Sequence, residues 1–397
     1  DLGHAGPLAP ARVNLVGGGL DERAPFGEGL PHVCGGQVRH GRGRGAPARL
    51  DADGEQRDSE HDGSHDGTFL RFIASLAAGR DRCPWATTLQ AWIPEEAGRF
   101  GEAEAVEARH QALGPLEGVV GLQWDSGRFK ADGLEAYVPY SRTRSQALFA
   151  LEEWRTPWGQ LQAGARVEQV SVRSDGSPLS SEFFLGERRF NPGSASLGGQ
   201  YKLAGDWLAT GQLAHSERAP SDAELFANGP HLATHTWETG NASLGLEKSN
   251  SIELGLERRN GPHPMKFSVY DSRFSNFIGL MAVPDAFKGD NALPEYAYAG
   301  VRARLRGWEA SGQSRVWQSA GTVDLHWRAD QVLADNLSTG QPLPRIAPWR
   351  VGLSGVYRFE AWQARLGFDH AAAQRRVPTG TEPTAAYTLW HASLNYR

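Results

Sequence analysis

The segment 216–256, SERAPSDAELFANGPHLATHTWETGNASLGLEKSNSIELGL, constrains the fold of this chain more than any other feature. A polar loop rich in Asn, Gly, Pro and His leads directly into a strict period-two alternation. Ile252, Leu254 and Leu256 share one face of the predicted strand, and Ser, Glu and Gly occupy the other. This arrangement is typical of a large antiparallel β-barrel returning from a surface loop.

The same alternation recurs from about residue 119 to the end of the chain. It is clearest in 160–170 and 322–330, where apolar side chains alternate with polar or charged ones. These strands predict an apolar outer face and a charged interior. The charged side chains that we expect on the inner face are Asp324, His326, Arg328, Arg302, Arg304 and Arg306.

The connections between the predicted strands alternate in length. Strands 351–360 and 362–369 are joined by almost no loop, whereas 335–348 and 372–385 are long and rich in turn-forming residues. Short turns at one end and long loops at the other favour a membrane barrel over a soluble sandwich.

Composition agrees with many short strands and excludes several classes of protein. The chain has 397 residues with 48 Gly and 13 Trp, and it contains no apolar run approaching the roughly 18 residues of a membrane helix. The net charge of −5 comes with no basic stripe, so no nucleic-acid partner is expected. Neither Gly-x-Ser-x-Gly nor His-Glu-x-x-His spacing occurs, so no enzyme is predicted. Cys34 and Cys83 form no Cys-x-x-Cys pair.

Two regions are predicted. Residues 1–85 lack alternation and carry few β-branched or aromatic residues, so we expect an irregular or disordered segment of uncertain origin. Residues 86–397 are predicted to form part of an all-β antiparallel barrel. About a dozen strands are readable in it. The chain begins at Asp1 without a basic n-region and an apolar h-region, so we expect that any export signal has been removed or was never included.

Several short motifs resemble the barrel of TonB-dependent outer-membrane receptors, most closely the branch that includes the zinc receptor. The resemblance covers roughly residues 119–397, and it departs from the family pattern at Ala242 and Gly245. The motifs that carry it are 217–220 (ERAP), 224–226 (ELF), 228–231 (NGPH), 240–244 (GNASL), 247–249 (EKS) and 304–310 (RLRGWEA).

This resemblance implies a transmembrane barrel of about 22 strands with long outer loops and short periplasmic turns. The chain would then be a part of such a barrel, because fewer strands are readable and no plug is recognisable in it. The implied location is the outer membrane of a Gram-negative bacterium. The implied partners are outer-membrane lipid and TonB with ExbB and ExbD, and no cofactor is required.

The implied activity is energy-coupled uptake of a scarce nutrient, first a metal ion such as zinc. A ferric siderophore or haem is the alternative cargo, since loops set specificity. A passive porin and a soluble β-sandwich binding module are the alternatives from other classes.

Two groups of side chains are candidate metal ligands. His231 and His235 lie in the loop of the opening segment with Glu224 and Glu238 near in sequence, and imidazole with carboxylate suits zinc. The competing interpretation is that His231 hydrogen-bonds within a folded loop and His235 is solvated. His61 and His65 form a second, weaker pair in the acidic segment 61–66.

Overall fold

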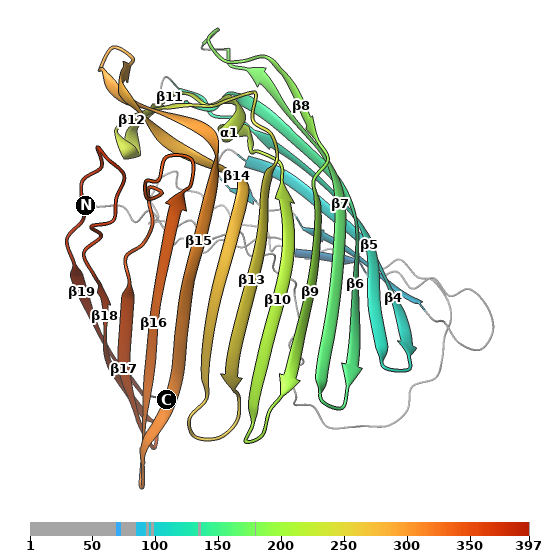
Figure 1. Ribbon diagram of the computed structural model, residues 1–397, viewed down its shortest axis with the longest axis vertical. Helices are drawn as coiled ribbons and strands as arrows, with labels where there is room; N and C mark the ends of the chain where they lie inside the picture. The colour runs from blue at the N-terminus through green and yellow to red at the C-terminus, as the bar shows by residue number, and fades with distance from the viewer. Residues whose placement is uncertain are drawn as a thin grey trace, which may run out of the picture. The chain divides into compact units, whose positions relative to one another are not determined.

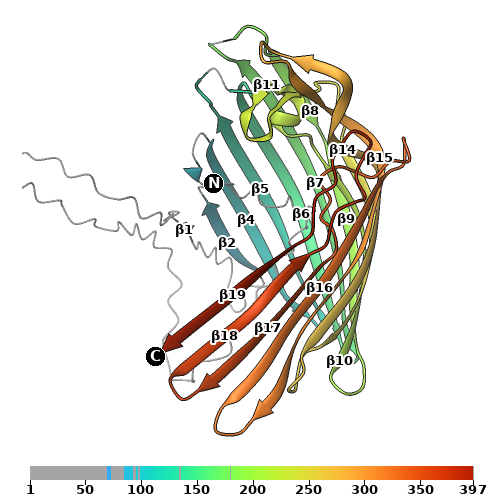
Figure 2. The same ribbon diagram turned by 90° about the vertical axis from the view of Figure 1, so that its left-hand side faces the viewer.

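The computed structural model describes residues 69–72, 85–92, 95–96, 99–133, 136–178 and 180–396. All of the described residues belong to one compact unit. The 19 strands found among them join into one sheet (Figures 1 and 2). The predicted all-β antiparallel fold is therefore confirmed, and the β-sandwich alternative is wrong because no second sheet forms from these strands.

The strands are β1 (Phe69–Phe72), β2 (Trp85–Trp92), β3 (Glu95–Glu96), β4 (Arg99–Leu113), β5 (Leu116–Phe129), β6 (Tyr140–Thr156), β7 (Gly159–Gly176), β8 (Gly186–Phe190), β9 (Gly193–Lys202), β10 (Trp207–Arg218), β11 (Asn228–His231), β12 (Thr236–Thr239), β13 (Glu247–Arg258), β14 (Met265–Lys288), β15 (Leu293–Gln318), β16 (Thr322–Asn336), β17 (Arg350–Phe359), β18 (Trp362–Ala371) and β19 (Tyr387–Tyr396). The helical elements among the described residues are α1 (Asp222–Phe226) and the 3-10 turn η1 (Leu232–Thr234). No helix in this part of the chain is long and apolar enough to cross a membrane.

The long strands follow one another as an antiparallel meander. Each long strand from β4 to β19 pairs with the next long strand of the chain, and β8 adds to the outer part of β7. Strands β11 and β12 belong to the connection between β10 and β13, and β12 runs parallel to β15. Strand β1 lies inside the segment 1–85, most of which is outside the described residues, so the domain boundary near residue 85 stays a prediction.

The two ends of the sheet differ as the sequence predicts. At one end, Phe359 pairs with Trp362 and Leu113 pairs with Leu116, so the turns between these strands hold two residues each. At the other end, residues 219–246, 337–349 and 372–386 connect strands through long segments (Figure 1). We call these the turn end and the loop end.

The two faces of the sheet differ in polarity. The apolar face is marked by exposed aliphatic residues, with Val167 60% and Leu254 53% exposed. Exposed apolar side chains at the middle of a sheet are unfavourable in water and favourable against lipid. The aliphatic residues that define the apolar face are Leu122, Leu148, Val167, Leu197, Leu213, Leu254, Val269, Leu353 and Leu366.

Aromatic rings gather on the apolar face at the turn end. The ring pairs that meet there are Trp158 with Tyr201, Trp317 with Tyr357, and Trp362 with Tyr396. Rings with an apolar body and a polar edge are enriched where hydrocarbon meets water. Their position marks one boundary of the apolar band.

The opposite, polar face carries paired charges. Asp324 has no exposed surface, and it accepts hydrogen bonds from Arg315 at 2.9 Å and Arg358 at 2.6 Å. Arg328 pairs with Asp369 at 2.7 Å on the neighbouring ladder. The predicted inner position of Asp324, His326 and Arg328 is thus confirmed.

The prediction for the three arginines of β15 is wrong. Arg304 lies opposite Arg273 of β14 and Asp335 of β16. Arg273 is an even number of positions along β14 from Val269, which is on the apolar face, so Arg273 and its partner Arg304 are on that face as well. Ala303, between Arg302 and Arg304, is the residue that is fully buried toward the other side. Arg302, Arg304 and Arg306 therefore lie on the same side of the sheet as the apolar face, nearer the loop end than its aliphatic residues.

Candidate functional site

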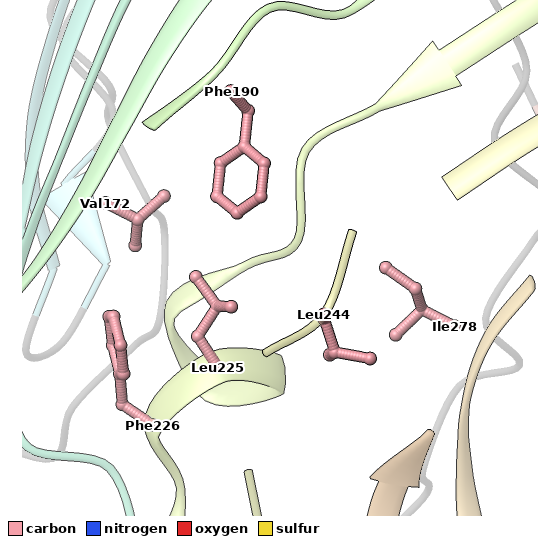
Figure 3. Packing of buried hydrophobic residues seen from close by; sticks show 6 residues of the cluster. All are labelled: Val172, Phe190, Leu225, Phe226, Leu244 and Ile278. Atoms are coloured by element: carbon pink, nitrogen blue, oxygen red, sulfur yellow. The ribbon is translucent and has the colours of Figure 1, made fainter. Parts of the chain in front are cut away.

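The connection between β10 and β13, residues 219–246, folds back over the polar face at the loop end. Leu225 and Phe226 of α1 are 1% and 2% exposed, and they pack with Val172 of β7 and Phe190 of β8 (Figure 3). Phe184 stacks on Phe226 with ring centroids 5.4 Å apart. These contacts give the loop its own apolar core, so it holds one position on the sheet.

The start of this loop is held by hydrogen bonds. Ser221 caps α1 by accepting from the backbone N–H of Glu224 at 3.2 Å, and the Glu224 carboxylate accepts from the backbone N–H of Ser221 at 2.7 Å. Arg218 donates to both oxygens of Glu224 and to Glu247. Burial lowers the pKa of Arg218, but the hydrogen bonds to these carboxylates raise it further, so its net pKa is above the ordinary value. Glu224 thus stabilises the loop.

His231, at the end of β11, meets a buried carboxylate. Its Nδ1 lies 2.8 Å from Oε1 of Glu238, which is only 2% exposed, and its ring stacks on Tyr137 at 4.7 Å between centroids. An ionised carboxylate only accepts hydrogen bonds, so Nδ1–H is the donor. In the neutral ring protonated at Nδ1 the lone pair is on Nε2, and none of the described residues hydrogen-bonds to Nε2.

Glu238 is itself held on its second oxygen. The hydroxyl of Tyr298 on β15 donates to Oε2 at 3.4 Å. Burial, followed by the negative charge of Glu238, raises the pKa of Tyr298, so the phenol stays protonated as a donor. The buried carboxylate therefore fixes the His231 ring from below, as a second-sphere carboxylate does in metal sites.

Strand β12, which carries Glu238, is anchored on the extension of β15. Trp237 and Glu238 lie beside Glu295 and Tyr296 in a parallel ladder. Glu295 accepts from Thr239 at 2.7 Å and pairs with Lys288 at 2.8 Å.

Two glycines allow the close packing of this loop. A Cβ on Gly229 would lie 2.8 Å from Cα of Tyr137, and one on Gly240 would lie 2.5 Å from the backbone N of Ala227. Both neighbours are backbone atoms, which cannot rotate away. Any larger side chain at either position would displace the strand that carries His231 or Glu238.

The structure thus brings His231 and Glu238 together and separates the other predicted residues from them. Glu224 belongs to the Arg218 network, and His235 is exposed in a left-handed conformation (φ 55°) after η1. His61 and His65 lie outside the described residues. Among those that are described, no group of three or more His, Cys, Asp or Glu side chains is placed to hold a metal ion.

The sequence analysis missed Tyr137, which stacks on His231 from the connection before β6, and Tyr298, which donates to Glu238 from β15. Tyr137 lies 94 residues before His231 and Tyr298 lies 67 residues after it, and neither lies in a motif with the histidine. Only the folded loop brings these rings to the pair.

The architecture defines a class of protein. A sheet with an apolar exposed face, a charged opposite face, short turns at one end and a docked loop at the other is the wall of a transmembrane β-barrel.

Comparison with known proteins identifies the family. The family described as "TonB dependent receptor-like, beta-barrel" matches residues 23–397, so the chain belongs to the TonB-dependent receptor barrel family. This family consists of outer-membrane transporters of Gram-negative bacteria that need no cofactor, and they are not enzymes. The porin alternative is accordingly wrong.

Solved structures show the same fold. The copper transporter OprC is 17% identical (TM-score 0.62), and the match covers 79% of this chain and 53% of OprC. The hemophore receptor HasR of Serratia marcescens is 15% identical (TM-score 0.55, 79% and 55% covered), and the FrpB iron transporter of Neisseria meningitidis is 11% identical (TM-score 0.53, 79% and 56% covered). The chain thus spans about half the length of these receptors.

Proposed function

We propose that this protein takes part in energy-coupled uptake of a metal ion, first zinc, across the outer membrane, with TonB, ExbB and ExbD as the coupling partners. The observation that supports a metal ion as the cargo is the hydrogen bond between His231 and the buried Glu238. His231 supplies Nε2 as the ligand, and Glu238 orients the ring through its hydrogen bond to Nδ1.

The chemistry favours a divalent metal over an apolar solute. A neutral imidazole whose other nitrogen donates to a carboxylate is the common form of a zinc-ligating histidine. Because the metal is the cargo, a few loop ligands suffice to capture it while water completes its coordination. His235, four residues further along and exposed, is the proposed second ligand.

Copper is the closest competitor within the metal class, since imidazole also binds Cu(II) strongly. The similarity to the copper transporter OprC supports testing both ions. A ferric siderophore or haem remains the alternative cargo, and it would use the Tyr137 and His231 rings as a stacking surface.

The test is isothermal titration of the full-length receptor with Zn(II) and with Cu(II). We expect binding by the wild type, a loss of about tenfold or more in affinity for His231→Ala, and a smaller loss for His235→Ala. His263→Ala is the matched control, because His263 lies in the connection between β13 and β14 at the turn end and should leave the affinity unchanged.

Equal affinities of the wild type and His231→Ala for both ions would refute the metal site. Titration with haem and with a ferric siderophore then decides between the alternative cargoes. Growth of cells on limiting zinc with and without TonB tests the coupling separately from the binding.

A further inference from the structure

Four arginines gather on the apolar face just above its aliphatic band, at the loop end. Arg273 on β14 lies directly opposite Arg304 on β15, and Arg302 and Arg306 flank Arg304 on the same face. A cavity of about 390 Å³ is lined by Arg273, Arg302 and Arg304 together with Asn250, Ser275 and Leu337.

Positive charge exceeds negative charge in this cluster. Asp271 pairs with Arg304 and lies 3.6 Å from Arg273, so one carboxylate serves two guanidinium groups. Arg302 and Arg306 are exposed, and their side chains have no ion-pair partner among the described residues.

The other carboxylates of this face are already engaged. Asp335, opposite Arg304, is held by Arg376, and Glu217 is held by Lys248 at 2.7 Å. Like charges directly opposite each other destabilise a sheet unless a counter-charge lies between them. Asp271 is the counter-charge between Arg273 and Arg304, and the cluster of four arginines keeps a net positive charge that an anion from outside the protein would neutralise.

The position of the cluster identifies the kind of anion. One step toward the turn end, the same face carries Ile252, Val269 and Trp308, and the exposed aliphatic band continues below them. Trp308 donates to Gln331 at 3.4 Å, as a ring at the edge of the hydrocarbon does. A ligand that reaches this cavity from the membrane has a charged head beside the arginines and an apolar tail beside the band.

We propose that Arg273, Arg302, Arg304 and Arg306 form a binding site for the phosphate-bearing headgroup of a membrane lipid. Guanidinium groups bind phosphate through paired, charge-assisted hydrogen bonds. Asn250 adds a polar neighbour, since its Oδ1 meets Nδ1 of His215 at 2.9 Å and its amide NH₂ is left to donate. The acyl chains lie on Leu254 and Val269. The bound lipid supplies the missing negative charge and fixes the depth of the barrel in the outer leaflet.

The experiment titrates the detergent-purified full-length receptor with lipid A, with dephosphorylated lipid A and with inorganic phosphate. The variant is Arg273→Gln with Arg304→Gln. Its matched control is Arg328→Gln with Arg350→Gln, which removes the same charge from paired arginines of the polar face. Circular dichroism and heat-dependent gel mobility establish that each variant is folded.

We expect saturable binding of lipid A that weakens with salt, and no comparable binding of the dephosphorylated lipid. The Arg273/Arg304 variant should bind lipid A about tenfold more weakly, about 1.4 kcal/mol, with a shallower dependence on salt. The control variant should bind as the wild type does.

Equal affinity of the two folded variants would overturn the proposal. So would equal binding of the phosphorylated and dephosphorylated lipids. Displacement of lipid A by inorganic phosphate at equal concentration would also overturn it, because the site would then recognise a free anion. If the Gln pair does not fold, Arg302→Gln with Arg306→Gln, both exposed, gives the same test.

Discussion

Replacing Leu225 by Ala should release the loop that carries His231 while leaving the sheet intact. Leu225 is 1% exposed, and it packs with Val172, Phe190 and Phe226 between the loop and the strands beneath it. None of these neighbours belongs to the apolar band, so the change acts on docking of the loop and not on the membrane-facing wall.

The magnitude follows from burial and from the inability of the site to collapse. A buried Leu→Ala change costs about 2–5 kcal/mol, the higher values being found where the cavity stays open. The backbone of Gly240 already lies against that of Leu225, since a Cβ added to Gly240 would be 2.7 Å from the Leu225 carbonyl carbon. The backbone therefore cannot move inward to fill the cavity that Leu225→Ala leaves. We therefore expect about 3 kcal/mol, which raises the undocked population about a hundredfold.

The assay is hydrogen exchange of the full-length receptor in detergent, read by mass spectrometry over residues 219–246. Leu232→Ala is the control, because Leu232 lies in the same loop but is 46% exposed. We expect faster exchange across the loop in Leu225→Ala, unchanged exchange in β13 to β15 below it, and no effect of Leu232→Ala. Identical loop exchange in the two variants would refute the idea that the apolar cluster holds the loop in place.

Three further outcomes are expected. Glu238→Gln should weaken zinc binding about tenfold with the loop still docked, because the ring keeps a hydrogen-bond partner but the carboxylate charge beside the bound cation is lost; zinc titration together with exchange measurements checks this. Gly240→Ala should accelerate exchange across the loop as Leu225→Ala does, since its Cβ meets backbone; wild-type exchange would contradict the clash. Although burial raises the pKa of Glu295, hydrogen bonds from Lys288 and Thr239 lower it further, so its net pKa is below the ordinary value. Its contribution to holding β12 is therefore present above the unfolded-state pKa of about 4.3 and is lost as pH falls through the folded-state value. Exchange at β12 should rise in the wild type as the pH falls below the unfolded-state pKa, and it should not change over the same range in Glu295→Gln.

The sequence by itself determined the kind of sheet. The alternation around Leu254 and Val167, the two-residue turn at Glu360–Ala361 and the long segments after Asn336 and Ala371 are local properties, since side-chain direction alternates along any strand. These features predicted the apolar face, the short turns and the long loops, and the structure confirms each of them.

The composition of the loop site was determined only in part. The sequence placed His231 and Glu238 in one loop, but it also grouped Glu224 with them, and the fold gives Glu224 to Arg218 and Ser221. Which carboxylate meets the imidazole depends on where α1 and β12 dock, and that is decided by burial of Leu225 and by ladders to distant strands.

Only the tertiary structure decided the face of Arg302, Arg304 and Arg306. Polarity reports the orientation of a strand only where one face touches hydrocarbon, because there the outward residues must be apolar. Beyond the aliphatic band both faces tolerate charge, so the polarity of the arginines does not indicate which face they occupy. The register of β15 against β14 and β16 supplies it, because pairing fixes the side-chain direction of every residue along the ladder.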